Sequence, residues 1–200
     1  MTNRFLLVLI QCLFISAAIY ANRKAPMDIP SFYQNKNVVV TGGCGFIGSH
    51  VVEKLVDAGA HVTIIDNLST GSKENIAAVI HKVTLIIGDI CDQSLCLKAT
   101  QSADIIFHLA AYISVPGSVS DPAQCYLTNV DGTATLLEAA RINQVKSFVF
   151  SSSAAVYGIH EGMCSENQSC NPTSPYGFSK LMGEQLCMQY RTVYKINTVI

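Results

Sequence analysis

The sequence predicts an α/β fold in which a parallel sheet carries helices on both faces. Short β-branched runs such as Val38-Val39-Val40 alternate with longer segments of helical spacing, and glycines follow the first run at once. Parallel neighbours need right-handed crossover connections, which helices supply. At 200 residues, with 50% hydrophobic and 14% charged residues, the chain can bury the core that this doubly wound fold requires.

The predicted elements follow one another along the chain. Strands are expected at residues 36–41, 61–65, 85–87, 105–109 and 147–150, because each is a short apolar run typical of a strand buried on both faces. Residues 49–58 show helical spacing, with Val51, Val52 and Leu55 on one side and Gly59 as the stop. Further helices are expected at 129–142 and 176–194, and residues 197–200 begin a sixth strand.

The amino-terminal residues stand apart from this domain. Residues 5–21 are apolar except for Gln11 and Ser16, and a length of about 17 residues is at the bottom of the range for a spanning helix. Residues 1–25 are therefore expected to be a signal peptide or a membrane anchor, 26–35 a linker, and 36–200 the folded domain. An anchored protein would belong to the endoplasmic reticulum or Golgi membrane, and otherwise it would be cytoplasmic.

Charge and cysteine spacing exclude two classes of site. The formal net charge is -1 and no block of Lys or Arg occurs, so no nucleic-acid partner is expected. The pairs Cys91 and Cys96, and Cys164 and Cys170, are too widely spaced for a zinc site, and no metal is expected. The eight cysteines are interpreted as buried thiols.

A glycine pattern directly after the first strand predicts a dinucleotide site of the Rossmann type. Gly42, Gly45 and Gly48 open the following helix, where they would permit a tight turn, close approach of a pyrophosphate, and packing of helix on strand. Asp66, at the end of the second strand, is placed to hydrogen-bond the hydroxyls of an adenosine ribose. The same carboxylate would repel the 2'-phosphate of NADP, so the pattern favours NAD over NADP. The alternative of a tight turn that binds nothing is disfavoured, because Asp66 matches the glycine spacing.

A second pattern predicts proton chemistry beside this site. Tyr176 and Lys180 are four residues apart in a helical segment, so both side chains fall on one face. The ammonium, together with the positive ring of NAD, would favour the phenolate form of Tyr176 as a base. Ser153, just past the fifth strand, would bring a hydroxyl to the same reacting oxygen. The order of these motifs carries the interpretation, since the tyrosine and lysine spacing alone is common.

Together these motifs resemble the extended short-chain dehydrogenases/reductases of the NAD-dependent epimerase/dehydratase family, most closely the UDP-glucose 4-epimerase-like branch. The resemblance covers nearly all of residues 37–200. Its segments, in order, are Thr41–His50, Asp66–Gly71, Gly88–Ile90, His108–Ala111, Ser114–Pro116, Asn129–Thr133, the serine segment 150–158 and Ser174–Lys180. The family adds a small carboxy-terminal substrate domain, before which this chain is expected to stop.

The resemblance also implies roles for individual residues. Ser153, Tyr176 and Lys180 would form the catalytic set, and Asn129 would support the site from its helix. Asp89 and Ile90 would flank the adenine. The implied cofactor-binding residues are Gly42, Gly45, Phe46, Ile47, Gly48, Asp66, Asn67, Ser69, Thr70, Gly71, Asp89, Ile90, Leu109, Ala110, Ala111, Asn129, Tyr176 and Lys180.

The implied activity is NAD-dependent 4-epimerisation of a nucleotide sugar of the UDP-glucose/UDP-galactose type, by removal and return of a hydride at C4. Related dehydratases carry an acid where this chain has Ala154 and Ala155, which favours epimerisation. The alternatives are a sterol-type NAD(P)-dependent dehydrogenase and a non-catalytic NAD-binding regulator, which would be expected to lose Tyr176 or Lys180. The expected partners are the nucleotide sugar, a second copy in a homodimer, and a membrane if residues 5–21 form a tether.

Overall fold

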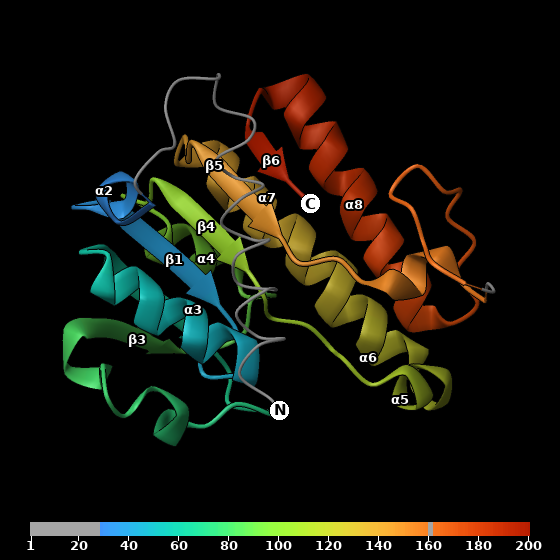
Figure 1. Cartoon of the computed structure of the whole chain (residues 1–200), viewed down its shortest axis with the longest axis horizontal. Coiled ribbons are helices and arrows are strands. Elements are labelled where there is room, and N and C mark those ends of the chain that lie inside the picture. The colour runs from blue at the N-terminus through green and yellow to red at the C-terminus, as the bar shows by residue number, and fades with distance from the viewer. Residues whose placement is uncertain (1–28, 160–161) are drawn as a thin grey trace.

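The computed structural model describes residues 29–159 and 162–200, which form a six-stranded parallel sheet (Figure 1). The strand order is β3-β2-β1-β4-β5-β6. Their bounds are β1 Asn37–Thr41, β2 His61–Asp66, β3 Val83–Ile87, β4 Ile105–His108, β5 Ser147–Phe150 and β6 Asn197–Val199. This is the order of the doubly wound dinucleotide-binding fold, so the predicted fold class is confirmed.

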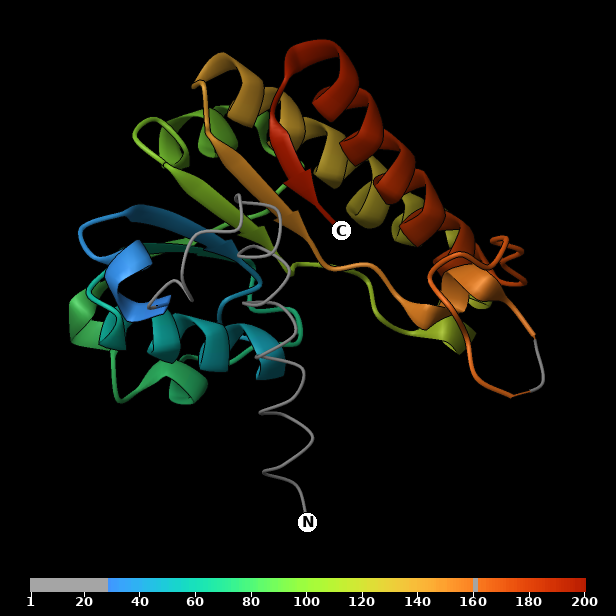
Figure 2. The same cartoon turned by 45° about the horizontal axis from the view of Figure 1, so that its top comes forward.

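Helices cover both faces of the sheet (Figure 2). On one face lie α2 Ile29–Tyr33 and α3 Phe46–Asp57, and on the other α4 Gln93–Ala99, α7 Gly132–Ile142 and α8 Pro175–Tyr194. Along β1, Val38 and Val40 pack against the first layer while Val39 packs against the second. A strand buried on both faces therefore reads as an unbroken apolar run.

Shorter elements connect these layers. After β4 the chain forms α5 Val115–Ser120, α6 Pro122–Tyr126 and a π-helical turn, η3, over Leu127–Asp131, which leads directly into α7. Single 3₁₀ turns are η1 Lys73–Ile76, η2 Ile80–Lys82 and η4 Ala154–Tyr157. The predicted helix at 129–142 is thus correct as a helix, but its first residues adopt the wider π geometry.

The structure moves several predicted boundaries. The first long helix begins at Phe46, three residues earlier than expected. The apolar pattern did not reveal this start because Phe46 and Ile47 are 71% and 38% exposed and do not extend the buried face of the helix. The third strand begins at Val83, which pairs with Val62. Part of the expected linker 26–35 is helical, since α2 brings the buried ring of Tyr33 to 6.3 Å from that of Phe107.

Cysteine burial is mixed. Cys44, Cys96, Cys125 and Cys187 are buried as expected, and Cys91 is half-buried. The expectation is wrong for Cys164 and Cys170, which are exposed because they lie in the connection between η4 and α8 rather than in a packed element.

No helix within 29–159 or 162–200 is long and apolar enough to cross a membrane. The predicted targeting segment, residues 5–21, lies outside the described residues.

Candidate active site

A cleft of about 450 Å³ opens where β1 and β4 end beside one another at the centre of the sheet. The strand order reverses at this point, and ligands of such sheets bind in the crevice that results. We call it the central cleft. The predicted residues that line it are Gly42, Gly45, Phe46, Ile47, Gly48, Asp66, Ser69, Thr70, Gly71, Leu109, Ala110, Ala111, Tyr176 and Lys180.

The glycine turn forms one wall of the central cleft. Gly42 has a φ of +69°, and a Cβ there would lie 2.7 Å from the Ala110 nitrogen. A Cβ on Gly48 would lie 2.0 Å from the Gly42 oxygen. Gly45 precedes the 12-residue α3 without a side chain to cap it, so the N–H groups of the first turn stay available to an anion. Gly42 and Gly48 are therefore required for the tight packing of the turn, which presents bare backbone to the central cleft.

Asp66 ends β2 at the edge of the central cleft, and it is 7% exposed. Its Oδ2 accepts from the Cys44 N–H and its Oδ1 from the Leu68 N–H, both at 2.8 Å. Each carboxylate oxygen keeps a lone pair beyond these bonds. The carboxylate is thus held in place by backbone and can still accept from ribose hydroxyls.

Four predicted cofactor residues do not line the central cleft. Asn67 donates to Asp89 Oδ2 at 3.0 Å, and the Cys91 N–H donates to Asp89 Oδ1 at 2.9 Å. Burial acts to raise the pKa of Asp89, but these hydrogen bonds outweigh it and the pKa is lowered. Ile90 is buried against Gly132, where a Cβ would come within 2.7 Å of it. Asn67 and Asp89 are thus hydrogen-bonded to each other outside the lining of the cleft.

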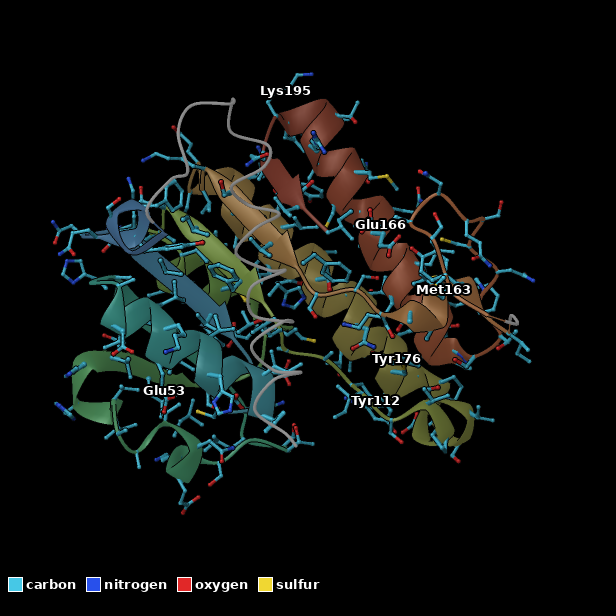
Figure 3. All side chains as sticks on the ribbon, viewed as in Figure 1. Glu53, Tyr112, Met163, Glu166, Tyr176 and Lys195 are labelled. Carbon is cyan, nitrogen blue, oxygen red and sulfur yellow. The ribbon has the colours of Figure 1, made fainter. Side chains whose placement is uncertain are left out.

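Asn129, the fourth, is a buried brace in the π-helical turn. Its Oδ1 accepts from the Tyr112 N–H at 2.7 Å, and its Nδ2 donates to the Tyr112 oxygen at 3.0 Å and to Ser179 Oγ at 2.9 Å. Ser179 in turn donates to the Tyr176 carbonyl at 2.7 Å. In the view of Figure 3, Tyr112 and Tyr176 lie near each other. Asn129 therefore ties the segment after β4 to the helix that carries Tyr176.

Tyr176 and Lys180 meet the central cleft from the first turns of α8. The helix begins at the cap Ser174, and the Tyr176 N–H donates to Ser118 Oγ at 3.1 Å. Lys180 is 5% exposed, and its Nζ donates to the Ser151 carbonyl at 3.0 Å and lies 5.1 Å from the centre of the Phe150 ring. Burial lowers the pKa of Lys180 to about 8.

Ser153 lies on the far side of the serine segment. It caps η4, and its Oγ accepts from the Ala155 N–H at 3.2 Å. It lines a neighbouring cavity of about 710 Å³, and Ser152 lines both spaces. The structure thus brings Ser151 and Ser152, rather than Ser153, to the wall shared with Tyr176 and Lys180.

Some residues of the site were not among the predicted site residues. Ile113, Ser151 and Ser152 complete the lining of the central cleft. The two serines lie in the serine segment 150–158, of which only Ser153 was predicted as a site residue. Glu184, one turn beyond Lys180, accepts from Ser152 Oγ at 2.5 Å. In the described ranges, no group of three or more His, Cys, Asp or Glu side chains could hold a metal ion.

Comparisons with known proteins agree with this geometry. Residues 38–200 match the model of the "NAD dependent epimerase/dehydratase family". The putative UDP-glucose 4-epimerase of Methanocaldococcus jannaschii is 41% identical over 166 residues, which make up 82% of this chain and 53% of that protein. The chain spans about half the length of the curated relatives it matches.

Solved structures are similar as well. The UDP-glucose 4-epimerase of Brucella ovis in complex with NAD is 36% identical with a TM-score of 0.76, over 82% of this chain and 50% of that one. The UDP-N-acetylglucosamine 4-epimerase of Methanobrevibacter ruminantium, in complex with UDP-N-acetylmuramic acid, is 42% identical with a TM-score of 0.79, over 82% and 53%. By sequence, fold and the glycine turn with its acid, the chain belongs to the NAD-dependent epimerase/dehydratase family.

Proposed function

We propose that the protein is an NAD-dependent 4-epimerase of nucleotide sugars, of the UDP-glucose/UDP-galactose type. The observation that carries the proposal is that one cleft joins the glycine turn and Asp66 at one end to Tyr176 and Lys180 at the other. A cofactor that spans the cleft would place its reactive ring beside a base. The relatives that match this chain over about half of their length are named as UDP-glucose 4-epimerases, one of them as putative, and they support the substrate class.

The lining of the central cleft fits NAD. The bare backbone of the glycine turn suits a pyrophosphate, and Asp66, already fixed by two N–H groups, suits a ribose with a free 2'-hydroxyl. A 2'-phosphate beside that buried carboxylate would meet like charge, so NADP is disfavoured.

The catalytic side chains would then divide the proton chemistry. When bound, NAD supplies the acceptor and donor of the hydride at the sugar C4. Tyr176 would take the proton of the 4-hydroxyl and return it, and Lys180, one helical turn away, lines the same cleft. Ser153 lines the neighbouring cavity, so a sugar that extends past Ser152 from the central cleft would meet its hydroxyl. The Ser153 oxygen already accepts from Ala155, which leaves the hydroxyl proton to be donated to that sugar.

The residues after the serine segment favour epimerisation over dehydration. Elimination of a sugar hydroxyl needs an acid or base near the departing group. Ala154 and Ala155 offer none, and Glu184 is engaged with Ser152.

Binding and turnover test this proposal separately. NADH binding to the 200-residue chain is followed by fluorescence, and conversion of UDP-galactose to UDP-glucose by chromatography. Tyr176→Phe is expected to lower turnover by about 10²- to 10⁴-fold while NADH binding persists. Tyr190→Phe is the matched control, since Tyr190 lies on the same helix but donates to Glu138. A wild-type chain that binds no NADH refutes the cofactor site. NADH binding without turnover refutes epimerase activity of the 200-residue chain by itself, and leaves the cofactor site standing.

A homodimer is part of the proposal. Helix α8 packs beside α6 and η3, and this surface leaves Leu127, Phe178 and Met182 46%, 45% and 44% exposed. Apolar side chains gathered on neighbouring helices suit burial against a second copy. Met182→Glu should shift the sedimentation of the chain to that of a monomer, whereas Val193→Glu, at the other end of α8, should not.

The role of residues 5–21 as a signal peptide or membrane tether is also proposed on the sequence alone. Mass spectrometry of the mature amino terminus and carbonate extraction of cell membranes test it. An uncleaved chain that carbonate extracts would count against both forms, and would leave the cytoplasmic alternative.

A further inference from the structure

A buried histidine lies directly beneath the central cleft. His108 ends β4 and is 2% exposed, with Phe148 and Phe150 each 5.7 Å away, measured between ring centres. Its Nδ1 is 2.7 Å from Thr41 Oγ1, at the end of β1, and its Nε2 is 2.9 Å from Thr133 Oγ1 on α7. One imidazole therefore joins the two central strands to a helix.

The direction of each hydrogen bond follows from the chain of partners. Thr133 Oγ1 lies 2.6 Å from the Asn129 carbonyl, which can only accept, so the Thr133 hydroxyl donates there. The Thr133 oxygen must then accept from an Nε2–H of His108. A neutral imidazole has one N–H, so the bare Nδ1 accepts from the Thr41 hydroxyl.

The Thr41 oxygen completes the chain, because it accepts from the Leu109 N–H at 3.2 Å and the Ala110 N–H at 3.1 Å. A charged imidazole would direct a second N–H at Thr41 and leave the Thr41 hydroxyl proton without this acceptor. Burial, and then the charge of Lys180, lower the pKa of His108 to about 3, in agreement with that geometry.

This chain of bonds sets the distance between the two walls of the central cleft. Thr41 directly precedes Gly42, and Leu109 and Ala110 form the facing wall. The two walls lie close together at Gly42, since a Cβ added there would lie only 2.7 Å from the Ala110 nitrogen. A Thr41 hydroxyl turned away from Ala110 would therefore shift the backbone that the cofactor meets.

We propose that His108, as a neutral imidazole protonated on Nε2, is a positioning residue that orients the Thr41 hydroxyl and so fixes the width of the cofactor cleft. This inference rests on the proposed binding of NAD. In this proposal His108 contacts neither cofactor nor substrate. It acts on the two walls through the hydroxyl of Thr41, which hydrogen-bonds to Leu109 and Ala110.

The test uses the full 200-residue chain and three threonine variants. Thr41→Val keeps the shape of the side chain but removes the hydroxyl, Thr41→Ser keeps the hydroxyl, and Thr63→Val makes the same change on the neighbouring β2, outside the central cleft. NADH affinity is expected to fall at least about tenfold in Thr41→Val, because the Ala110 N–H and His108 Nδ1 lose their partner. Thr41→Ser should restore most of the affinity, and Thr63→Val should retain it.

A second measurement is made on the wild type and requires no variant that binds NADH. In ¹⁵N-histidine-labelled wild type, long-range ¹H–¹⁵N correlation should show His108 protonated on Nε2 alone, unchanged between pH 8 and pH 5.5. The His108→Gln spectrum, which lacks that signal, assigns it.

The outcomes separate the two proposals. If the wild type binds NADH and Thr41→Val binds it equally well while losing stability, His108 and Thr41 are merely structural and this inference alone is overturned. Protonation on Nδ1, or titration in that range, overturns it too. If the wild type binds no NADH, the proposed function falls first.

Discussion

Replacing Lys180 by methionine should make the protein more stable at neutral pH while removing a group of the proposed catalytic set. Burial lowers the pKa of Lys180 from 10.5 to about 8. Since a tenfold change in proton affinity is worth about 1.4 kcal/mol, carrying the charge in the folded state costs about 3 kcal/mol. Methionine has a similar length and no charge, but it forfeits the hydrogen bond to the Ser151 carbonyl, worth about 1–2 kcal/mol. The net gain is about 1–2 kcal/mol.

The pH dependence gives the sign of this effect independently. Below pH 8 both the folded and the unfolded chain are protonated at Lys180, so the folded state bears the full cost. As pH rises from 8 towards 10.5, the folded state releases its proton first and becomes more stable. Between pH 7 and pH 9.5 the wild type should gain about 2 kcal/mol relative to Lys180→Met.

Urea unfolding followed by circular dichroism, at pH 7 and pH 9.5, measures both quantities. Lys98→Met is the matched control, since Lys98 is exposed near the end of α4 and should show neither effect. Tyrosine and cysteine titrations are common to all three proteins and cancel in the differences. A Lys180→Met protein that is less stable than the wild type at pH 7, with the same response to pH, would refute the argument that the buried ammonium is costly.

Three further predictions concern the fold and the cofactor site. Because the pKa of His108 is lowered to about 3, the unfolded chain takes up its proton first as pH falls below 6.5; unfolding free energy should drop by about 1.4 kcal/mol between pH 7.5 and 5.5, and His108→Gln should lack that share. Gly177→Ala should lower the unfolding free energy by about 1–3 kcal/mol in a urea titration, since its Cβ would lie 2.7 Å from the Ala155 oxygen. Asp66→Asn should weaken NADH at least about tenfold and NADPH far less, and equal losses in the two fluorescence titrations would contradict the assigned ribose contact.

The sequence predicts the strands well because β1 and its neighbours are buried on both faces. Burial on both faces requires consecutive apolar residues, which are visible as short apolar runs. The glycine turn and Asp66 were predicted from the sequence equally well, because the backbone conformation of the turn requires glycine and recognition of a ribose requires a carboxylate. The first turn of α3 was missed since Phe46 and Ile47 face outward. Helix α2 was missed because its burial depends on Phe107, far along the chain.

The part of the cleft near Tyr176 and the serine segment was harder to predict from the sequence than the glycine turn. Tyr176 and Lys180 come from one helix, and helical spacing predicts that they meet. The serine segment has no regular spacing, so the order in which Ser151, Ser152 and Ser153 face the two cavities depends on contacts with Lys180 and Glu184. Likewise, the π geometry around Asn129 departs from the period of 3.6 residues on which sequence patterns rest.

The central position of β1 has a consequence for how the protein is made. Thr41 pairs with His108 across 67 residues of sequence, so the cleft has only one of its walls until the ribosome has completed β4. At 5–20 residues per second, that interval lasts roughly 3–13 s. Meanwhile one edge of β1 is an open template for strands of other chains. Nascent chains arrested before residue 105 should therefore be prone to aggregate and unable to gain from added dinucleotide, which can stabilise only a chain whose centre has closed.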